Sequence, residues 1–149
     1  MGLHIDDFYR EAALGLLTLY QSFPRPVTLY LDDMGGILPP DEVGLPHPRQ
    51  QHCLSTLLWL GNEGYIRHLG TIGYDAVDQA ELTEKAFVRL ASSQHPFATA
   101  LHASPPSVRR AQGSFAQQLR QHLQARDSEA LITVMQHFFT MAPVSTPAV

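Results

Sequence analysis

The side chains that most often hold a metal ion or act as nucleophiles are present, but not in the spacing that such chemistry needs. The chain has eight histidines and one cysteine, and His52 stands next to that cysteine, Cys53. Neighbouring residues of a helix point about 100° apart, so this pair cannot easily share one ion. Neither Cys-x-x-Cys nor His-x-x-x-His occurs, and we expect no metal and no other cofactor. Cys53 is expected to be a small buried side chain, with redox sensing as the alternative.

Two pairs of adjacent carboxylates, Asp6–Asp7 and Asp32–Asp33, are candidates for acid–base work. Residues that are neighbours in sequence are better explained as a helix cap in the first pair and a turn in the second. The chain has no Gly-rich phosphate loop and no Gly-x-Ser-x-Gly motif. We therefore do not expect an enzyme.

A third group of polar residues alternates with a leucine stripe in "PRQQHCLSTLLWLGNEG". Pro48 suits the first turn of a helix, and the spacing of Leu54, Leu57, Leu58 and Gly61 predicts its inward face. The opposite face is predicted to carry short or planar hydrogen-bonding groups: Arg49, Gln51, His52, Ser55 and Thr56. Arginine and glutamine can pair with guanine and adenine edges, and serine or threonine with bases or phosphates. The alternative is an ordinary solvated helix face.

The elements before this helix are predicted from capping residues and periodicity. A first helix is expected from Asp6 or Asp7 to Ser22, ended by the prolines of "FPRPV". The segment "VTLYLDDM" fits a strand and a short helix equally well. Residues 35–48 hold three glycines and four prolines and are expected to be mostly loop.

The elements after it are read in the same way. Gly61 and Gly64 suit a left-handed helix cap and a tight turn, and two short strands are expected to form a hairpin around Gly70. Thr83 is expected to cap the next helix. Two helices follow, in "SVRRAQGSFAQQLRQHLQAR" and "DSEALITVMQHFFTM", the second capped by Asp127 or Ser128. That last helix is apolar around most of its circumference, so it must be buried in the fold or against a partner.

The stretch "LSTLLWLGNEGYIRH", followed by "LTEKAFVRL", resembles the winged helix-turn-helix superfamily. In that family a recognition helix ends in a Leu-x-x-x-Gly-Tyr-Ile step, and the wing returns into a Leu-Thr-x-Lys-Gly helix start. The resemblance covers residues 5–94; Ala86 replaces the family's glycine, and the 35–48 loop is longer than its usual turn. It implies an α+β, mostly α fold, with a winged-helix domain and small β-hairpin wing over 1–94 and two appended helices within 95–149.

The same resemblance implies a role in DNA binding. The helix from Arg49 to Leu60 would lie in a major groove, and Arg67 and His68 of the wing would reach the minor groove or a phosphate. Lys85 would add to this basic patch. The implied protein is a transcriptional regulator that binds double-stranded DNA and forms a homodimer through residues 108–141.

The distribution of charge supports an alternative from another class. Residues 1–47 carry a net charge of −5, residues 48–94 of −1 and residues 95–149 of +2. The alternative is a winged-helix protein-interaction or assembly module without DNA contact, and a third reading is a ligand-sensing regulator. The arrangement of four basic side chains separates these readings: Arg49, Arg67, Lys85 and Arg89. If they converge on one face, DNA binding is favoured, and if they are scattered, the interaction module is favoured.

The cellular compartment is predicted from what the sequence lacks. A single cysteine allows no internal disulfide and fits a reducing compartment. The first residues lack the basic region and cleavage site of a signal peptide. No stretch reaches the roughly 18 apolar residues of a membrane span. We therefore expect a cytoplasmic protein without a membrane partner.

Overall fold

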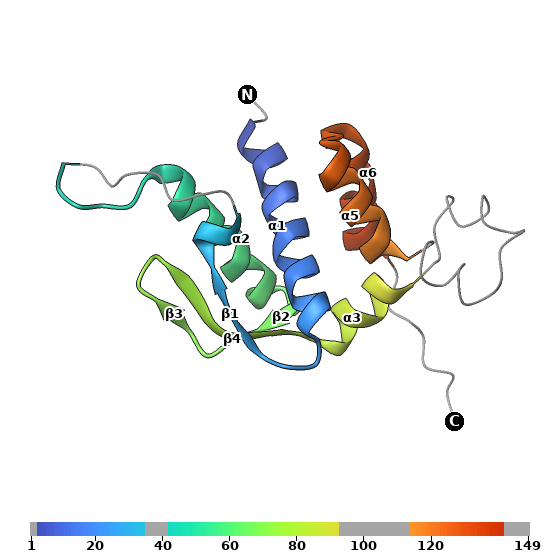
Figure 1. Cartoon of the computed structure of the whole chain (residues 1–149), viewed down its shortest axis with the longest axis horizontal. Helices are drawn as coiled ribbons and strands as arrows, with labels where there is room; N and C mark the ends of the chain where they lie inside the picture. Colours follow the sequence, from blue (N-terminus) through green and yellow to red (C-terminus); the bar gives the residue numbers. More distant parts are fainter. Residues whose placement is uncertain (1–2, 35–41, 93–113, 142–149) are drawn as a thin grey trace, which may run out of the picture.

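Helices lie over one side of a small antiparallel sheet, and a terminal helical pair stands beside the first helix (Figure 1). The computed structural model describes residues 3–34, 42–92 and 114–141. The first half of the Gly/Pro loop, the start predicted for the helix of "SVRRAQGSF" and the C-terminal tail lie outside these residues. The predicted α+β, mostly helical fold class is confirmed.

The first helix, α1, runs from Leu3 to Ser22. Its buried positions follow a helical period at Ala12, Leu16 and Leu19. The start predicted at Asp6 or Asp7 was wrong, because the helix begins earlier. Asp6 instead stands in the first turn, where a carboxylate interacts favourably with the positive end of the helix dipole.

Both readings of "VTLYLDDM" are realised in succession. Strand β1 covers Val27–Tyr30, and a single 3-10 turn, η1, covers Leu31–Met34. The two apolar ends of η1 are three residues apart, which a 3-10 helix places on one side, and both are buried. The aspartates between them remain exposed.

The second helix, α2, covers Pro48–Asn62, with Pro48 at its start as predicted. The His47 ring caps it, since Nδ1 accepts from the Arg49 backbone N–H at 3.1 Å. Gly64 turns the chain at a φ of 80°, which confirms the predicted turn. Gly61 remains inside the helix and is not the cap. A Cβ there would lie 3.1 Å from His68 Nε2, so the glycine allows close packing.

The sheet is organised around β4, Ala76–Leu82, which pairs with β1 on one side and with β2, Ile66–Arg67, and β3, Thr71–Ile72, on the other. The hairpin predicted around Gly70 is therefore displaced. Gly70 joins two strands that both pair with β4, and the reversal occurs between β3 and β4. The physical reason is the length of β4, along which β2 and β3 pair in one continuous register. The irregularity near Gln79, a non-glycine residue with a φ of 49°, instead shifts the register of β4 against β1.

Helix α3, Glu84–Ala91, begins where the sequence predicts. Thr83 caps it, because its Oγ1 accepts from the Ala86 backbone N–H at 3.3 Å. The same hydroxyl donates to the carbonyl oxygen of Gly64 at 2.7 Å. One side chain therefore ends the strand, begins the helix and fixes both to the turn after α2.

The last two helices are α5, Phe115–Ala125, and α6, Ser128–Thr140, and Asp127, one of the two predicted candidates, caps the latter. The buried side of α6 carries Leu131, Val134, Met135 and Phe138. These side chains belong to the same core as those of α1, so the apolar face of α6 is covered within the chain. A homodimer through residues 108–141 remains a prediction. Among the described helices, none is long and apolar enough to cross a membrane.

Candidate functional site

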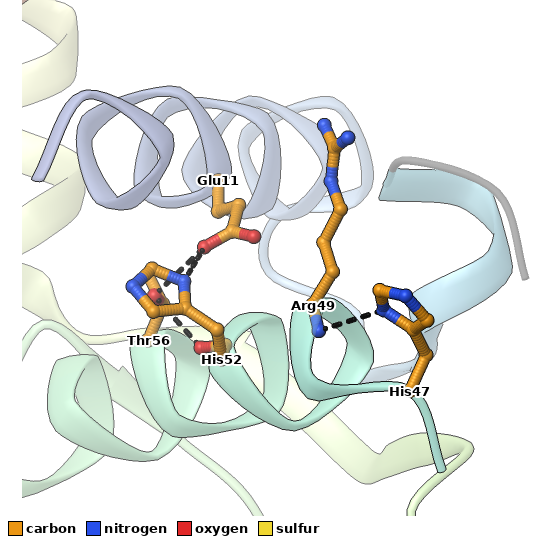
Figure 2. A network of polar contacts seen from close by, with 5 residues as sticks. All are labelled: Glu11, His47, Arg49, His52 and Thr56. Atoms are coloured by element: carbon orange, nitrogen blue, oxygen red, sulfur yellow. Dashed lines mark hydrogen bonds and ion pairs between the residues drawn. The ribbon is translucent and has the colours of Figure 1, made fainter. Parts of the chain in front are cut away.

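The polar residues predicted to face solvent on α2 divide between two sides of the helix. At about 100° per residue, Gln51, Ser55 and Asn62 fall close together, and all three are exposed. Arg49 is exposed too, but it lies about 140° from the centre of that face. Figure 2 shows its side chain rising on the side where α1 lies. Within α2, all of which the structure describes, the face formed by Gln51, Ser55 and Asn62 thus has neither a lysine nor an arginine, and the one exposed basic side chain, Arg49, lies outside it.

His52 and Thr56 turn toward α1 because a buried carboxylate lies there (Figure 2). Glu11 is 2% exposed, and its Oε1 accepts from Thr56 Oγ1 at 3.0 Å and lies 2.8 Å from His52 Nδ1. A buried carboxylate is costly unless such hydrogen bonds compensate for lost water. The prediction that both residues face solvent was therefore wrong: Thr56 is buried and His52 is half-buried. Sequence gave no sign of a partner so far along the chain.

A hydrogen-bonded Glu–His pair can act as a general base when a nucleophile stands next to the ring. The neighbouring thiol does not fit this role. Burial, followed by the charge of Glu11, raises the pKa of Cys53 to about 12, so the thiol stays protonated at neutral pH. Ser55, the nearest exposed hydroxyl on α2, makes no hydrogen bond with His52 among the described residues. The network therefore fastens α1 to α2.

Metal binding has no better support in the described parts of the chain. No group of three or more histidine, cysteine, aspartate or glutamate side chains there is arranged to hold an ion. The rings of His4 and His52 are 6.4 Å apart and meet edge to face. That arrangement is an aromatic contact.

The basic side chains predicted for the wing are engaged within the chain. Arg67 Nε lies 3.3 Å from Glu81 Oε1 across the β2–β4 pair. His68 Nδ1 accepts from the Gly70 backbone N–H at 2.9 Å, and its ring packs against Gly61. The charge of Arg67 is thus partly countered, and His68 shapes the connection between β2 and β3.

Lys85 and Arg89 lie near the far end of α2 and serve two different contacts. Lys85 Nζ donates to the carbonyl oxygen of Glu63 at 3.1 Å and stands 4.2 Å from the centre of the Tyr65 ring. Arg89 is buried. It donates to the Tyr65 hydroxyl at 3.2 Å and to the carbonyl oxygens of Phe138 and Met141 at 3.2 and 2.8 Å.

The four basic side chains therefore do not converge. Glu63, whose carbonyl oxygen accepts from Lys85, lies about 21 Å from Arg49 along the axis of α2. Arg89 is inside the core, and Arg67 is paired with a carboxylate. These positions are scattered, which is the arrangement that favours the interaction module over DNA.

The exposed surface that sequence reasoning missed lies on the sheet. Tyr30 and Ile72 pair with Ala76 from opposite sides of β4, so the three side chains project from one face. Leu29 and Val77 project from the other face and are buried in the core. Ala76 is fully buried but lies outside that core, which is consistent with cover by its two large neighbours. We call Tyr30, Ile72 and the exposed Tyr74 of the following turn the hairpin face.

Carboxylates surround the hairpin face. Asp75 lies in the turn, and its carbonyl oxygen accepts from the Leu31 backbone N–H at 3.0 Å. That bond brings the exposed pair Asp32 and Asp33 of η1 close to the turn. Neither residues 26–48 nor residues 68–84 contain a lysine or arginine. The absence of basic residues around "TIGYD" is the signal in the sequence that could have drawn attention to this acidic region.

An aromatic cluster around Trp59 joins α1, α2 and α6. Trp59 meets Phe8 of α1 and Phe139 of α6 edge to face, with ring centres 5.1 and 5.4 Å apart. It also stacks on Tyr65 at 6.2 Å. Trp59 is partly exposed, and its contacts fix how α1, α2 and α6 meet.

No protein-family model, curated protein or solved structure matches the chain. The grounds for a function are thus the surfaces described above. Among them, the hairpin face departs most from an ordinary solvated surface, because three large apolar side chains stand together in acidic surroundings.

Proposed function

We propose that the chain is a non-enzymatic protein-interaction module, and that its hairpin face binds a polypeptide segment in which apolar side chains are flanked by lysine or arginine. The proposal includes a winged-helix arrangement. The order α1, β1, η1, α2, hairpin, α3, with the last strand β4 at the centre of the sheet, supports that arrangement. The 3-10 turn η1 would replace the usual second helix.

The observation that carries the proposal is the exposure of apolar side chains at one end of the sheet, away from α3 (Figure 1). Tyr30, Ile72 and Tyr74 are each about half exposed. Aromatic and aliphatic side chains of this size supply most of the binding energy at protein interfaces. Burial against a partner contributes about 25 cal/mol for each Å² of apolar surface removed from water.

The charges around the hairpin face select the kind of partner. Asp32, Asp33 and Asp75 lie beside it, and residues 26–48 and 68–84 contain no lysine or arginine. Gln50 of α2 donates to the Tyr74 carbonyl oxygen at 2.8 Å, so Arg49, the preceding residue, is the basic residue that adjoins this contact. The field of the three carboxylates attracts a basic segment and repels an acidic one, which affects the association rate and the choice of partner more than the final affinity.

The same charges oppose phosphate. A DNA-binding wing and recognition helix draw their affinity from several contacts between basic side chains and phosphates. Here the exposed residues of α2 include only one basic side chain, Arg49, which lies apart from Gln51, Ser55 and Asn62, and the turn of the hairpin presents Asp75. DNA binding and transcriptional regulation stay predictions, with less in the arrangement to support them. A cytoplasmic location fits the proposal, since the single cysteine is buried and free.

The test is fluorescence anisotropy with a labelled short peptide that alternates arginine with leucine and tryptophan. Because the interface is small and exposed, we expect a Kd of about 10 µM that weakens as salt is raised. A peptide with glutamate in place of arginine should not bind. Mixed-sequence duplex DNA is titrated in parallel.

Ile72→Ser is the informative variant, and Ile5→Ser is its matched control. Both isoleucines are 47% exposed, but Ile5 lies on α1, away from the hairpin face. We expect Ile72→Ser to weaken peptide binding at least about fivefold and Ile5→Ser to leave it unchanged. Equal effects of the two variants, or binding of the glutamate peptide, would exclude the hairpin face as the docking surface. Tight DNA binding unaffected by Ile72→Ser would favour the DNA-binding protein instead.

A further inference from the structure

A groove lies between α1 and the turn that joins α5 to α6, on a different side of the molecule from the hairpin face. Its volume is about 400 Å³. Small-molecule pockets in proteins span roughly 300–1,000 Å³, so the groove is large enough for a small organic ligand. Its walls come from elements far apart in the sequence, and all of its lining residues lie in the described ranges.

The lining has two chemical parts. Leu14, Leu123 and Leu131 supply apolar surface, one from each helix. Arg10, His122 and Arg126 supply the basic groups. Among the described residues, neither guanidinium is within ion-pair distance of a carboxylate. An apolar surface with two arginines at its edge matches a ligand that has a hydrocarbon body and one anionic end.

The backbone at Arg126 is a second, independent observation. This residue caps the end of α5 in the left-handed region, with a φ of 54°. Glycine is the usual residue there, because a side chain makes the conformation costly. Arg126 thus occupies a position where glycine would be more favourable for the backbone. A role of its side chain in the groove would explain why an arginine stands there.

Three carboxylates lie near enough to affect a bound anion. Asp127 lines the groove, but its Oδ1 accepts from the Ala130 backbone N–H at 3.1 Å as the cap of α6. Asp6 and Asp7 precede Arg10 by about one turn of α1. Within the lining itself, two arginines face one aspartate, so the groove keeps a net positive charge before His122 is counted.

We infer that this groove binds a carboxylate with a short hydrocarbon chain. The chain lies on the three leucines, and the carboxylate is held by Arg10 and Arg126. This ligand site goes beyond the proposed interaction with a basic peptide and does not depend on it, because no residue is shared between the groove and the hairpin face.

The experiment titrates octanoate into the full chain and follows backbone amide signals by NMR, with octylammonium as the ligand of opposite charge. We expect saturable binding of octanoate with a Kd of about 1 mM or tighter. The shifts should concentrate at residues 10–14 and 122–131. Octylammonium should bind at least about tenfold more weakly.

Arg126→Gly separates binding from folding. Glycine favours the left-handed cap, so this variant should keep or raise the Tm while losing at least about fivefold in octanoate affinity. Arg10→Gln should weaken binding similarly, whereas Arg25→Gln, an exposed arginine outside the groove, should not. Equal binding of the two ligands, or affinity unchanged by Arg126→Gly, would overturn the inference, as would no saturable binding. Ile72→Ser should leave octanoate binding unchanged, so the peptide site and the groove can fail separately.

Discussion

The α1–α2 contact and the β3–β4 hairpin treat their carboxylates and apolar side chains in opposite ways. Between the helices, Glu11 is buried and its hydrogen bonds with His52 and Thr56 compensate for lost water. At the hairpin, Asp75 stays in solvent beside exposed Ile72 and Tyr74. A polar residue type on a helix therefore does not mark a binding surface. The two regions differ in which side chains stay exposed: the polar network between the helices is mostly buried, whereas the apolar side chains of the hairpin are about half exposed.

The largest expected effect comes from Glu11→Ala. Removing the carboxylate leaves half-buried His52 Nδ1 without this partner and leaves buried Thr56 Oγ1 with only the His52 carbonyl oxygen at 3.1 Å, and it opens a small cavity between the helices. We expect a loss of about 3 kcal/mol in the free energy of unfolding, measured by urea denaturation. If the loss is below about 1 kcal/mol, the network is not what fastens α1 to α2.

Two neighbouring hydroxyls provide the control for that variant. Thr56→Val keeps the shape and removes the hydroxyl that Glu11 and the His52 carbonyl oxygen accept from, so about 1 kcal/mol should be lost. Ser55→Ala, on the exposed side of the same turn, should stay within about 0.5 kcal/mol of the parent.

The next largest effect concerns Cys53, which lies on the buried side of α2. Burial and the charge of Glu11 raise its pKa from 9.0 to about 12. The stability that follows from this shift is fully present below pH 9 and is lost as the pH rises toward 12, because the unfolded chain ionises first. At pH 8, iodoacetamide should react at least about a hundredfold more slowly with the folded chain than with the chain in urea.

An exposed cysteine on the same helix sharpens this comparison. In a Cys53→Ala background, Ser55→Cys should react at nearly the rate of a free thiol, since position 55 faces solvent. A fast reaction of native Cys53 would mean that α2 opens readily from α1, and the two regions would no longer differ as described.

The last comparison contrasts two arginines. Arg89→Leu removes hydrogen bonds to Tyr65, Phe138 and Met141, and we expect a loss of about 2 kcal/mol together with faster amide exchange at the end of α6. Arg67→Gln breaks only an exposed pair with Glu81, so its effect should stay within about 0.5 kcal/mol. Equal losses would show that the hairpin contributes more to stability than its exposure indicates.

Sequence was a good guide wherever structure depends on neighbouring residues. Pro48 at the start of α2 and the caps Thr83 and Asp127 were all predicted, because capping involves residues within one turn. The burial of α6 also followed from its period. Its place against α1 did not, since a periodic face does not identify the surface that covers it.

The candidate site was predicted less well because it depends on contacts between residues far apart in the sequence. The sequence predicted one polar face on α2, but Glu11 draws His52 and Thr56 away from it across a long sequence separation. The position of the reversal was missed because β2 and β3 pair with β4 in one continuous register, so that together they act as one strand interrupted at Gly70. The hairpin face depends on side chains brought together from β1 and β3, which no local pattern reveals.

The junction around Trp59 makes the chain its own spectroscopic reporter. Trp59 is the only tryptophan in the sequence, and it touches rings from α1 and α6 as well as Tyr65. Its emission maximum is therefore set by the docking of these helices on one another. A red shift that precedes the loss of helical circular dichroism during urea denaturation would reveal separation of α6 as a distinct step, without any label attached to the protein.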